Sequence, residues 1–167
     1  MSSIRTGAAA EVWQGLVLDA CRRSGQALDE TCEAYLVFAL LRHQRDPQLL
    51  AYTQALEWLN AQAQVGSARI DALQDVGDRC LLIAGLFPGL AQRRRVSVDY
   101  FIELGRGAYR DVAEGGRNAT AALFSRLAST YRELVQVLGA VREVPAWESH
   151  AASLALAPAP AGGTRIH

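Results

Sequence analysis

The sequence predicts an all-α protein: an up-and-down helical bundle of about six helices followed by a flexible C-terminal tail. Apolar residues recur at intervals of three and four along most of the chain, and no stretch alternates polar and apolar residues as a half-buried strand does. Glycine and proline separate the apolar segments. The chain has 167 residues, of which 50% are hydrophobic, so it is long enough for one domain with its own core. We expect that domain at 1–144 and the tail at 145–167.

The first half of the chain predicts three helices. The first covers about 9–23. The second covers about 29–43, with Asp29 as N-cap, and its middle is apolar nearly all round, which predicts a central, buried element. The third begins at Asp46-Pro47, where aspartate caps the helix and proline takes its first position, and it ends near Gly66.

The second half predicts three more helices. One begins at Ser67 and is stopped by Pro88-Gly89. The next begins at Ser97 as N-cap and is broken by Gly115-Gly116. The last runs from about 118 to 142 with an apolar stripe close to a heptad pattern. The final ten residues are rich in proline, alanine and glycine, so we expect a mobile tail with local docking of Trp147, Leu154 and Leu156.

Four small residues stand on the inward faces of two of these helices. They are Gly77, Gly85, Gly105 and Ala108. A glycine inside a helix costs about 1 kcal/mol relative to alanine, so a compensating interaction is expected. We predict close helix–helix packing there. Gly105-x-Gly107 is not interpreted as a dinucleotide motif, because it follows no strand and lacks the third glycine.

Composition excludes several chemistries. The chain has 17 basic and 17 acidic residues, and every basic residue is arginine. Without lysine there can be no Schiff-base enzyme and no ordinary P-loop nucleotidase. Balanced charge provides no global field for nucleic acid, and the aromatic residues are not interleaved with the arginines, so we expect no nucleic-acid partner.

The longest apolar runs are Tyr35–Leu41 and Cys80–Phe87, far short of the ~20 residues of a membrane span. The N-terminus lacks the pattern of a secretory signal. The three cysteines are odd in number, have no CxxC spacing and lie in apolar patterns, which is typical of reduced core thiols. We therefore expect a cytoplasmic protein without a membrane span.

Catalytic and metal-binding signals are absent from the sequence pattern. His43 stands at a helix end, where interaction with the helix dipole explains it. Asp71, Asp75 and Asp78 share one helix face, which we interpret as a polar outer face, although Asp78 is flanked by the inward-facing Gly77. Acid–base catalysis by a carboxylate pair is left open, but no pair is nominated. We expect no catalytic residue, no metal site and no cofactor, and favour a protein that is not an enzyme.

The run Arg93-Arg94-Arg95 follows the Pro-Gly stop without an acidic residue between the arginines. Such a run is commonly a solvated corner, where cations also stabilise a helix C-terminus. Guanidinium groups can instead hold a phosphate, a carboxylate ligand or an acidic protein surface. The candidate ligand-binding residues are Arg93, Arg94, Arg95, Tyr100, Arg106 and Tyr109.

The segment 77–113 resembles an uncharacterised family of all-helical bacterial proteins. The family pattern pairs a helix ending in a Gly-x-Phe-Pro-like motif with a basic turn and an aromatic helix. The matching residues are Gly77, Asp78, Cys80, Gly85, Phe87, Pro88, Arg93 to Arg95, Val98, Tyr100, Phe101, Leu104, Gly105, Ala108 and Tyr109. Phe101 replaces a tyrosine of the pattern, and Ile83 replaces a small polar residue. The resemblance implies a helical fold and no particular activity.

Two functions follow as expectations. The first is a non-enzymatic cytoplasmic interaction or regulatory protein, which binds a protein partner or associates with itself through apolar helix faces. The second is a binder of an anionic small molecule or nucleotide at the arginine-rich corner.

Overall fold

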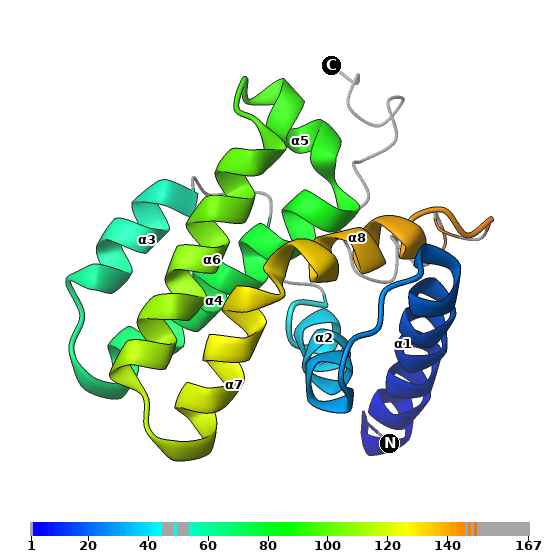
Figure 1. The fold of residues 1–167 in the computed structure, drawn as a ribbon, viewed down its shortest axis with the longest axis horizontal. Helices are drawn as coiled ribbons and strands as arrows, with labels where there is room; N and C mark the ends of the chain where they lie inside the picture. The colour runs from blue at the N-terminus through cyan, green and yellow to red at the C-terminus, as the bar shows by residue number, and fades with distance from the viewer. Residues whose placement is uncertain (1, 45–48, 50–53, 146, 148, 150–167) are drawn as a thin grey trace.

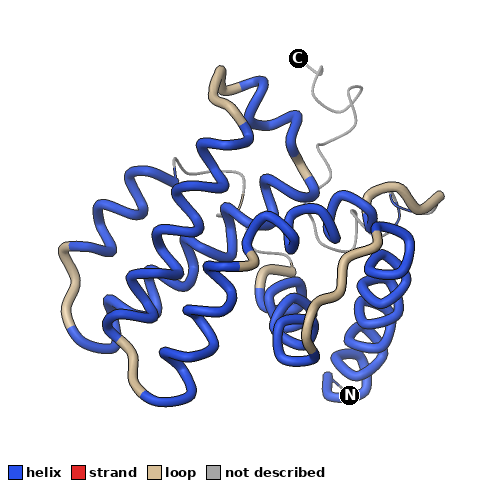
Figure 2. The backbone as a smooth tube through the Cα atoms, viewed as in Figure 1, coloured by secondary structure: helices blue, strands red, loops and turns tan. Residues whose placement is uncertain are grey.

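The computed structural model describes residues 2–44, 49, 54–145, 147 and 149, and within these residues the protein is all-helical (Figure 2). The predicted all-α class is therefore confirmed. Eight helices are present in this part of the chain: α1 (Ser2–Ser24), α2 (Glu30–Arg42), α3 (Gln54–Gln62), α4 (Gly66–Leu86), α5 (Pro88–Arg93), α6 (Val98–Gly115), α7 (Asn118–Ser129) and α8 (Tyr131–Val141).

The expected number of about six helices is only roughly right, because two regions are divided. Pro88-Gly89 ends α4 as predicted, but Pro88 also suits the first position of a helix, and the short α5 begins there. The predicted helix at 118–142 is interrupted at Thr130, whose φ of −106° and ψ of 16° are not helical. The interruption lets α8 take a different direction from α7 (Figure 1).

The helix α4 is the centre of the fold. It packs against α3 and α6, and α7 packs in turn on α6. These four helices run roughly along one direction, as in the predicted bundle, whereas α8 crosses α4 and reaches α1 (Figure 1). The helices α1 and α2 lie side by side at the other end of the molecule. One cluster of buried apolar residues connects all of these helices.

Two of the predicted helix starts are confirmed in atomic detail. The side chain of Asp29 accepts a hydrogen bond from the backbone N–H of Cys32 at 2.8 Å. The hydroxyl of Ser97 accepts one from the N–H of Tyr100 at 3.0 Å. Each bond satisfies a donor that the first helical turn leaves unpaired. Of the other predicted starts, Asp46-Pro47 lies outside the described residues, and α4 begins at Gly66, one residue before the predicted Ser67.

The predicted close approach of helices at small residues is also confirmed. A Cβ atom at Gly77 would overlap the ring of Tyr109. At Gly85 it would overlap Leu138, and at Gly105 it would overlap the hydroxyl of Tyr131. The missing side chains therefore make room for α6 and α8 against α4.

The C-terminal region was predicted to dock through Trp147. Trp147 is partly buried against the core, and its ring centroid is 6.1 Å from that of Phe87. Leu154 and Leu156 lie outside the described residues. Among the residues that the structure describes, no helix is both long enough and apolar enough to cross a membrane.

Candidate functional site

A buried carboxylate lies at the junction of α2, α4 and α6. Asp78, in the middle of α4, is 0% exposed. Its Oδ1 accepts hydrogen bonds from the hydroxyl of Tyr35 on α2, at 2.7 Å, and from that of Tyr109 on α6, at 2.5 Å. An ionised carboxylate is stable inside a protein only when hydrogen bonds or charges replace the lost water, and two tyrosines supply part of that replacement.

The second oxygen of Asp78 faces the end of α2. His43 Nε2 lies 3.0 Å from Asp78 Oδ2, and Arg42 Nε lies 3.8 Å from the same oxygen. Arg42 also reaches Asp75, one turn earlier on α4, with 2.6 Å between Nη2 and Oδ1. Partial burial is the largest single effect on Arg42 and opposes its charged form, but the hydrogen bond to Asp75 and the charges of Asp75 and Asp78 together outweigh it and raise the pKa of the guanidinium.

Further polar and aromatic contacts hold the two tyrosines. Gln74 donates a hydrogen bond to the hydroxyl of Tyr35 at 2.9 Å. The rings of Tyr35 and Tyr109 both make edge contacts with Phe124 of α7, at centroid distances of 5.4 and 5.3 Å. Burial, followed by the charge of Asp78, raises the pKa of both hydroxyls far above the ordinary tyrosine value. Both tyrosines are therefore neutral donors at physiological pH.

The expected positions of His43 and Asp78 are only partly right. His43 is the C-terminal cap of α2, as the sequence predicts, but it is also buried beside Asp78. The predicted polar outer face describes the exposed Asp71 and in part the half-buried Asp75, whereas Asp78, whose side the sequence leaves open, is buried. The neighbouring Gly77 pointed inward in the sequence pattern, and it does face the core, against Tyr109.

The structure can hold a cation only where several ligand atoms converge. Within the described part of the chain, one group meets this condition: ligand atoms of His43, Asp75 and Asp78 lie within 4.8 Å of one another. The sequence offered no metal signature, because the histidine and the aspartates are more than thirty residues apart and are brought together only by the packing of α2 on α4.

The predicted ligand-binding residues do not form one cluster. Arg93 and Arg95 are exposed, and Arg94 is half-buried and lines a hollow of about 450 Å³ with Gln54, Val96 and Phe101. Tyr100 is 42% exposed at the start of α6. Tyr109 is eleven residues beyond Val98, about 16 Å along the helix axis, and its hydroxyl is bound to Asp78. Packing thus separates Tyr109 from the arginine corner.

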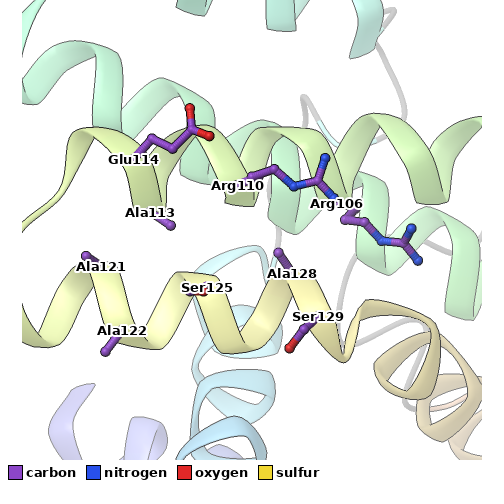
Figure 3. Close-up of a pocket in the computed structure, with 9 residues that line it drawn as sticks. All are labelled: Arg106, Arg110, Ala113, Glu114, Ala121, Ala122, Ser125, Ala128 and Ser129. Carbon is purple, nitrogen blue, oxygen red and sulfur yellow. The ribbon is translucent and has the colours of Figure 1, made fainter.

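Arg106, the remaining predicted residue, lines a groove between α6 and α7. The groove has a volume of about 860 Å³ and is lined by small and hydroxyl side chains, two arginines and one glutamate (Figure 3): Arg106, Arg110, Ala113, Glu114, Ala121, Ala122, Ser125, Ala128 and Ser129. We call this the α6/α7 groove. Figure 3 shows Ala113 pointing towards α7 and Ala121 towards α6, with the two arginine side chains extended along α6.

The two arginines of this groove differ in their pairing. Arg106 Nη1 lies 3.2 Å from Glu103 Oε2, one turn earlier on the same helix. Arg110 is exposed, and within the described part of the chain the structure shows no carboxylate paired with it. A surface ion pair within one helix, such as Arg106–Glu103, contributes little to stability. Both guanidinium groups are therefore available to a ligand.

Comparison of the chain with protein-family models, with curated proteins and with solved structures gives no match. The resemblance of segment 77–113 to an uncharacterised helical family stays a prediction. The functional interpretation therefore depends on the chain's own geometry.

Proposed function

We propose that this protein is a non-enzymatic interaction protein that binds an acidic helical segment of a partner protein in the α6/α7 groove. The observation that supports this proposal is the groove itself, which places two arginines, with Glu114 at its end, beside a surface of alanine and serine. The proposal keeps the expected class of interaction or regulatory protein and assigns it a surface.

The shape of the groove favours a helix. On α6 the lining residues are four residues apart, at Arg106, Arg110 and Glu114, and on α7 they recur at Ala121, Ser125 and Ser129. These are neighbours on successive turns, so each wall is a straight ridge about 12 Å long. Alanine and serine let a third helix approach closely, as small residues do in helix-in-groove recognition.

The chemistry of the groove favours carboxylates in that helix. Arg106 and Arg110 lie one turn apart, a spacing that matches acidic residues at positions i and i+4 of a partner helix. Arginine is enriched at protein interfaces because its planar donor group binds carboxylates in a bidentate manner. Both serines of α7 add hydroxyl groups that can donate or accept hydrogen bonds.

We also propose that the protein works in the cytoplasm. The support is chemical: the three cysteines are all free and buried, as expected in a reducing compartment.

The experiment is selection from a displayed library of helical peptides. Peptides are selected on the wild-type protein and tested against Arg106→Glu/Arg110→Glu. We expect enrichment of aspartate and glutamate at four-residue spacing, and at least a tenfold loss of affinity in the double variant. A matched control is Arg22→Glu on α1, whose side chain is 73% exposed and pairs only locally with Asp19. Selected peptides without acidic enrichment, or binding that survives the double variant, would refute the proposal.

A second candidate is the anionic small-molecule site at the arginine corner. The hollow beside Arg94 is the observation that favours it. A thermal-shift panel of nucleotides, phosphates and organic acids tests it, with Arg93→Ala/Arg94→Ala/Arg95→Ala alongside. We expect any stabilising ligand of this class to lose its effect in the triple variant. A panel without a shift would count against this site and leave the α6/α7 groove as the binding surface.

A further inference from the structure

We propose that His43, Asp75 and Asp78 form a binding site for a divalent transition-metal cation, with Zn²⁺ as the best-fitting probe. The site is independent of the α6/α7 groove. It joins the end of α2 to the middle of α4 and contains one imidazole and two carboxylates. Nitrogen and oxygen donors in this combination suit zinc, whereas magnesium prefers an all-oxygen set.

The donor atoms are already close to the spacing that a cation requires. They lie within 4.8 Å of one another, and His43 Nε2 is 3.0 Å from Asp78 Oδ2. Zinc binds such atoms at about 2.0–2.2 Å, so two of its ligands are typically about 3–3.5 Å apart. Asp75 lies at the half-buried edge of the site, so its side chain is the ligand with most room to adjust to a cation.

The surroundings of Asp78 resemble the support that metal ligands receive in proteins. Its Oδ1 is held by the hydroxyls of Tyr35 and Tyr109, which leaves Oδ2 directed at His43. Gln74 in turn holds Tyr35. A ligating carboxylate is commonly oriented through its second oxygen in this way. The tyrosines and His43 satisfy Asp78, and Asp75 adds a second carboxylate within 4.8 Å of the same imidazole.

Arg42 is the group that a metal ion would replace. Its guanidinium contacts both carboxylates, at 2.6 Å from Asp75 and 3.8 Å from Asp78. It therefore supplies a positive charge at the mouth of the site when no metal is bound. The side chain is 33% exposed and comes from the last residue of α2, so it can turn to solvent without unpacking the core. Arg42 and the cation thus compete for the same carboxylates.

Because Arg42 and the cation compete, removing Arg42 should strengthen metal binding, whereas removing a ligand should weaken it. The full chain is stripped with a chelator and titrated with Zn²⁺ by calorimetry, and with Co²⁺ by visible absorption. We expect one equivalent of Zn²⁺ to bind, and a Co²⁺ spectrum unlike that of the hydrated ion. Arg42→Gln removes the competitor and should tighten Zn²⁺ binding severalfold. Mg²⁺ should bind far more weakly.

Matched variants separate this site from other binding. Asp75→Asn should weaken Zn²⁺ binding more than tenfold, whereas Asp71→Asn, one turn earlier and exposed, should leave it unchanged. The double variant His150→Gln/His167→Gln removes the other two histidines of the chain and should retain binding. Arg106→Glu/Arg110→Glu should also retain it. Circular dichroism checks that each variant is folded.

Three results would overturn the proposal. They are absence of Zn²⁺ binding to the wild-type chain, equal losses in the Asp71 and Asp75 variants, and loss of binding in the double histidine variant alone. Failure of Arg42→Gln to tighten binding would show that the guanidinium is not in the cation position. None of these results bears on the peptide selection, so the two proposals fail separately.

Discussion

At the scale of single residues, the buried carboxylate of Asp78 is stabilised by side chains from two other helices. Tyr35 and Tyr109 donate to one oxygen, while His43 and Arg42 face the other. Breaking a buried charged network by removing one partner is costly, because the remaining groups keep their desolvation penalty. The residue that sequence analysis left unsettled is therefore the polar centre of the core.

Removing one donor tests how strongly this network contributes to folding. Tyr109→Phe keeps the ring contacts but deletes a hydrogen bond to the carboxylate, and a hydrogen bond to a charged group contributes about 1.5–3 kcal/mol. We expect the free energy of unfolding, measured by urea denaturation, to fall by about that amount. Tyr100→Phe, at an exposed position, should change it by less than about 0.5 kcal/mol. Equal effects of the two substitutions would contradict the network.

The backbone conformation of Arg95 allows a test of whether its side chain stabilises the turn. Its φ of 59° lies in the left-handed region, which is strained for residues other than glycine. Arg95→Gly should raise the free energy of unfolding by up to about 1 kcal/mol. Arg93→Gly, within α5, should instead lower it by about 1 kcal/mol. A fall in stability on Arg95→Gly would mean that its side chain makes stabilising contacts at this turn.

At the scale of elements, the packing of α6 and α8 on α4 depends on small residues at the points of contact. A Cβ at Gly105 would overlap the hydroxyl of Tyr131 and lie 2.8 Å from Cβ of Cys80. That hydroxyl donates to the backbone oxygen of Gly77 at 2.8 Å, so displacing it would also break a buried hydrogen bond. The close contact and the hydrogen bond both exclude a larger residue.

Alanine substitutions at Gly105 and Gly107, both on α6, measure how much this close packing contributes to stability. Gly105→Ala should destabilise the protein by about 1–3 kcal/mol through overpacking. Gly107→Ala meets nothing within 4 Å of the new Cβ atom, so it should be stabilising by up to about 1 kcal/mol through helix propensity. Thermal unfolding followed by circular dichroism gives both values. A stabilising Gly105→Ala would show that α6 can shift away from α4 without loss.

The interruption between α7 and α8 differs from the single helix that the sequence predicts. Hydrophobic periodicity continues across Thr130, so the pattern predicted one helix where α7 and α8 are distinct. The break is a tertiary effect, because α8 changes direction to pack on both α4 and α1. A periodic pattern records which residues are buried, but not whether one straight axis buries them all.

At the scale of the whole molecule, three buried tyrosines couple folding to alkaline pH. Burial raises the pKa of Tyr35, Tyr109 and Tyr131 in the folded protein. Below the unfolded-state pKa of about 10, these hydroxyls are protonated in both states and stability is unaffected. Above it, only the unfolded chain loses the protons, so stability falls by up to about 1.4 kcal/mol per pH unit for each tyrosine.

The expected outcome is cooperative alkaline unfolding. Tyrosinate absorbance from these three residues should rise together with the loss of the helical circular dichroism signal. Tyr100→Phe serves as a control that removes an exposed tyrosine and should leave the cooperative transition in place. Ionisation of all the tyrosines while the helical signal is intact would show that the three hydroxyls are accessible in the folded state.

The sequence by itself determined the helical class, the N-caps Asp29 and Ser97, and the helix faces of α4 and α6 that carry small residues for close packing. These properties depend on residues close together in the chain, so local periodicity and capping chemistry reveal them. The sequence also predicted Arg106 as a ligand-binding residue, and Arg106 does line the α6/α7 groove. The prediction grouped it with Tyr109, however, whose hydroxyl is bound to Asp78 in the core.

Only the tertiary structure decided the environments of His43 and Asp78, the split of the last predicted helix and the position of the α6/α7 groove. The physical reason is that a helix sequence shows which face is apolar but not which helix will cover it. Asp78 is stabilised by residues 43 positions earlier and 31 positions later in the chain, Tyr35 and Tyr109. Burial of a charge depends on such distant partners, and only the packed helices bring them together.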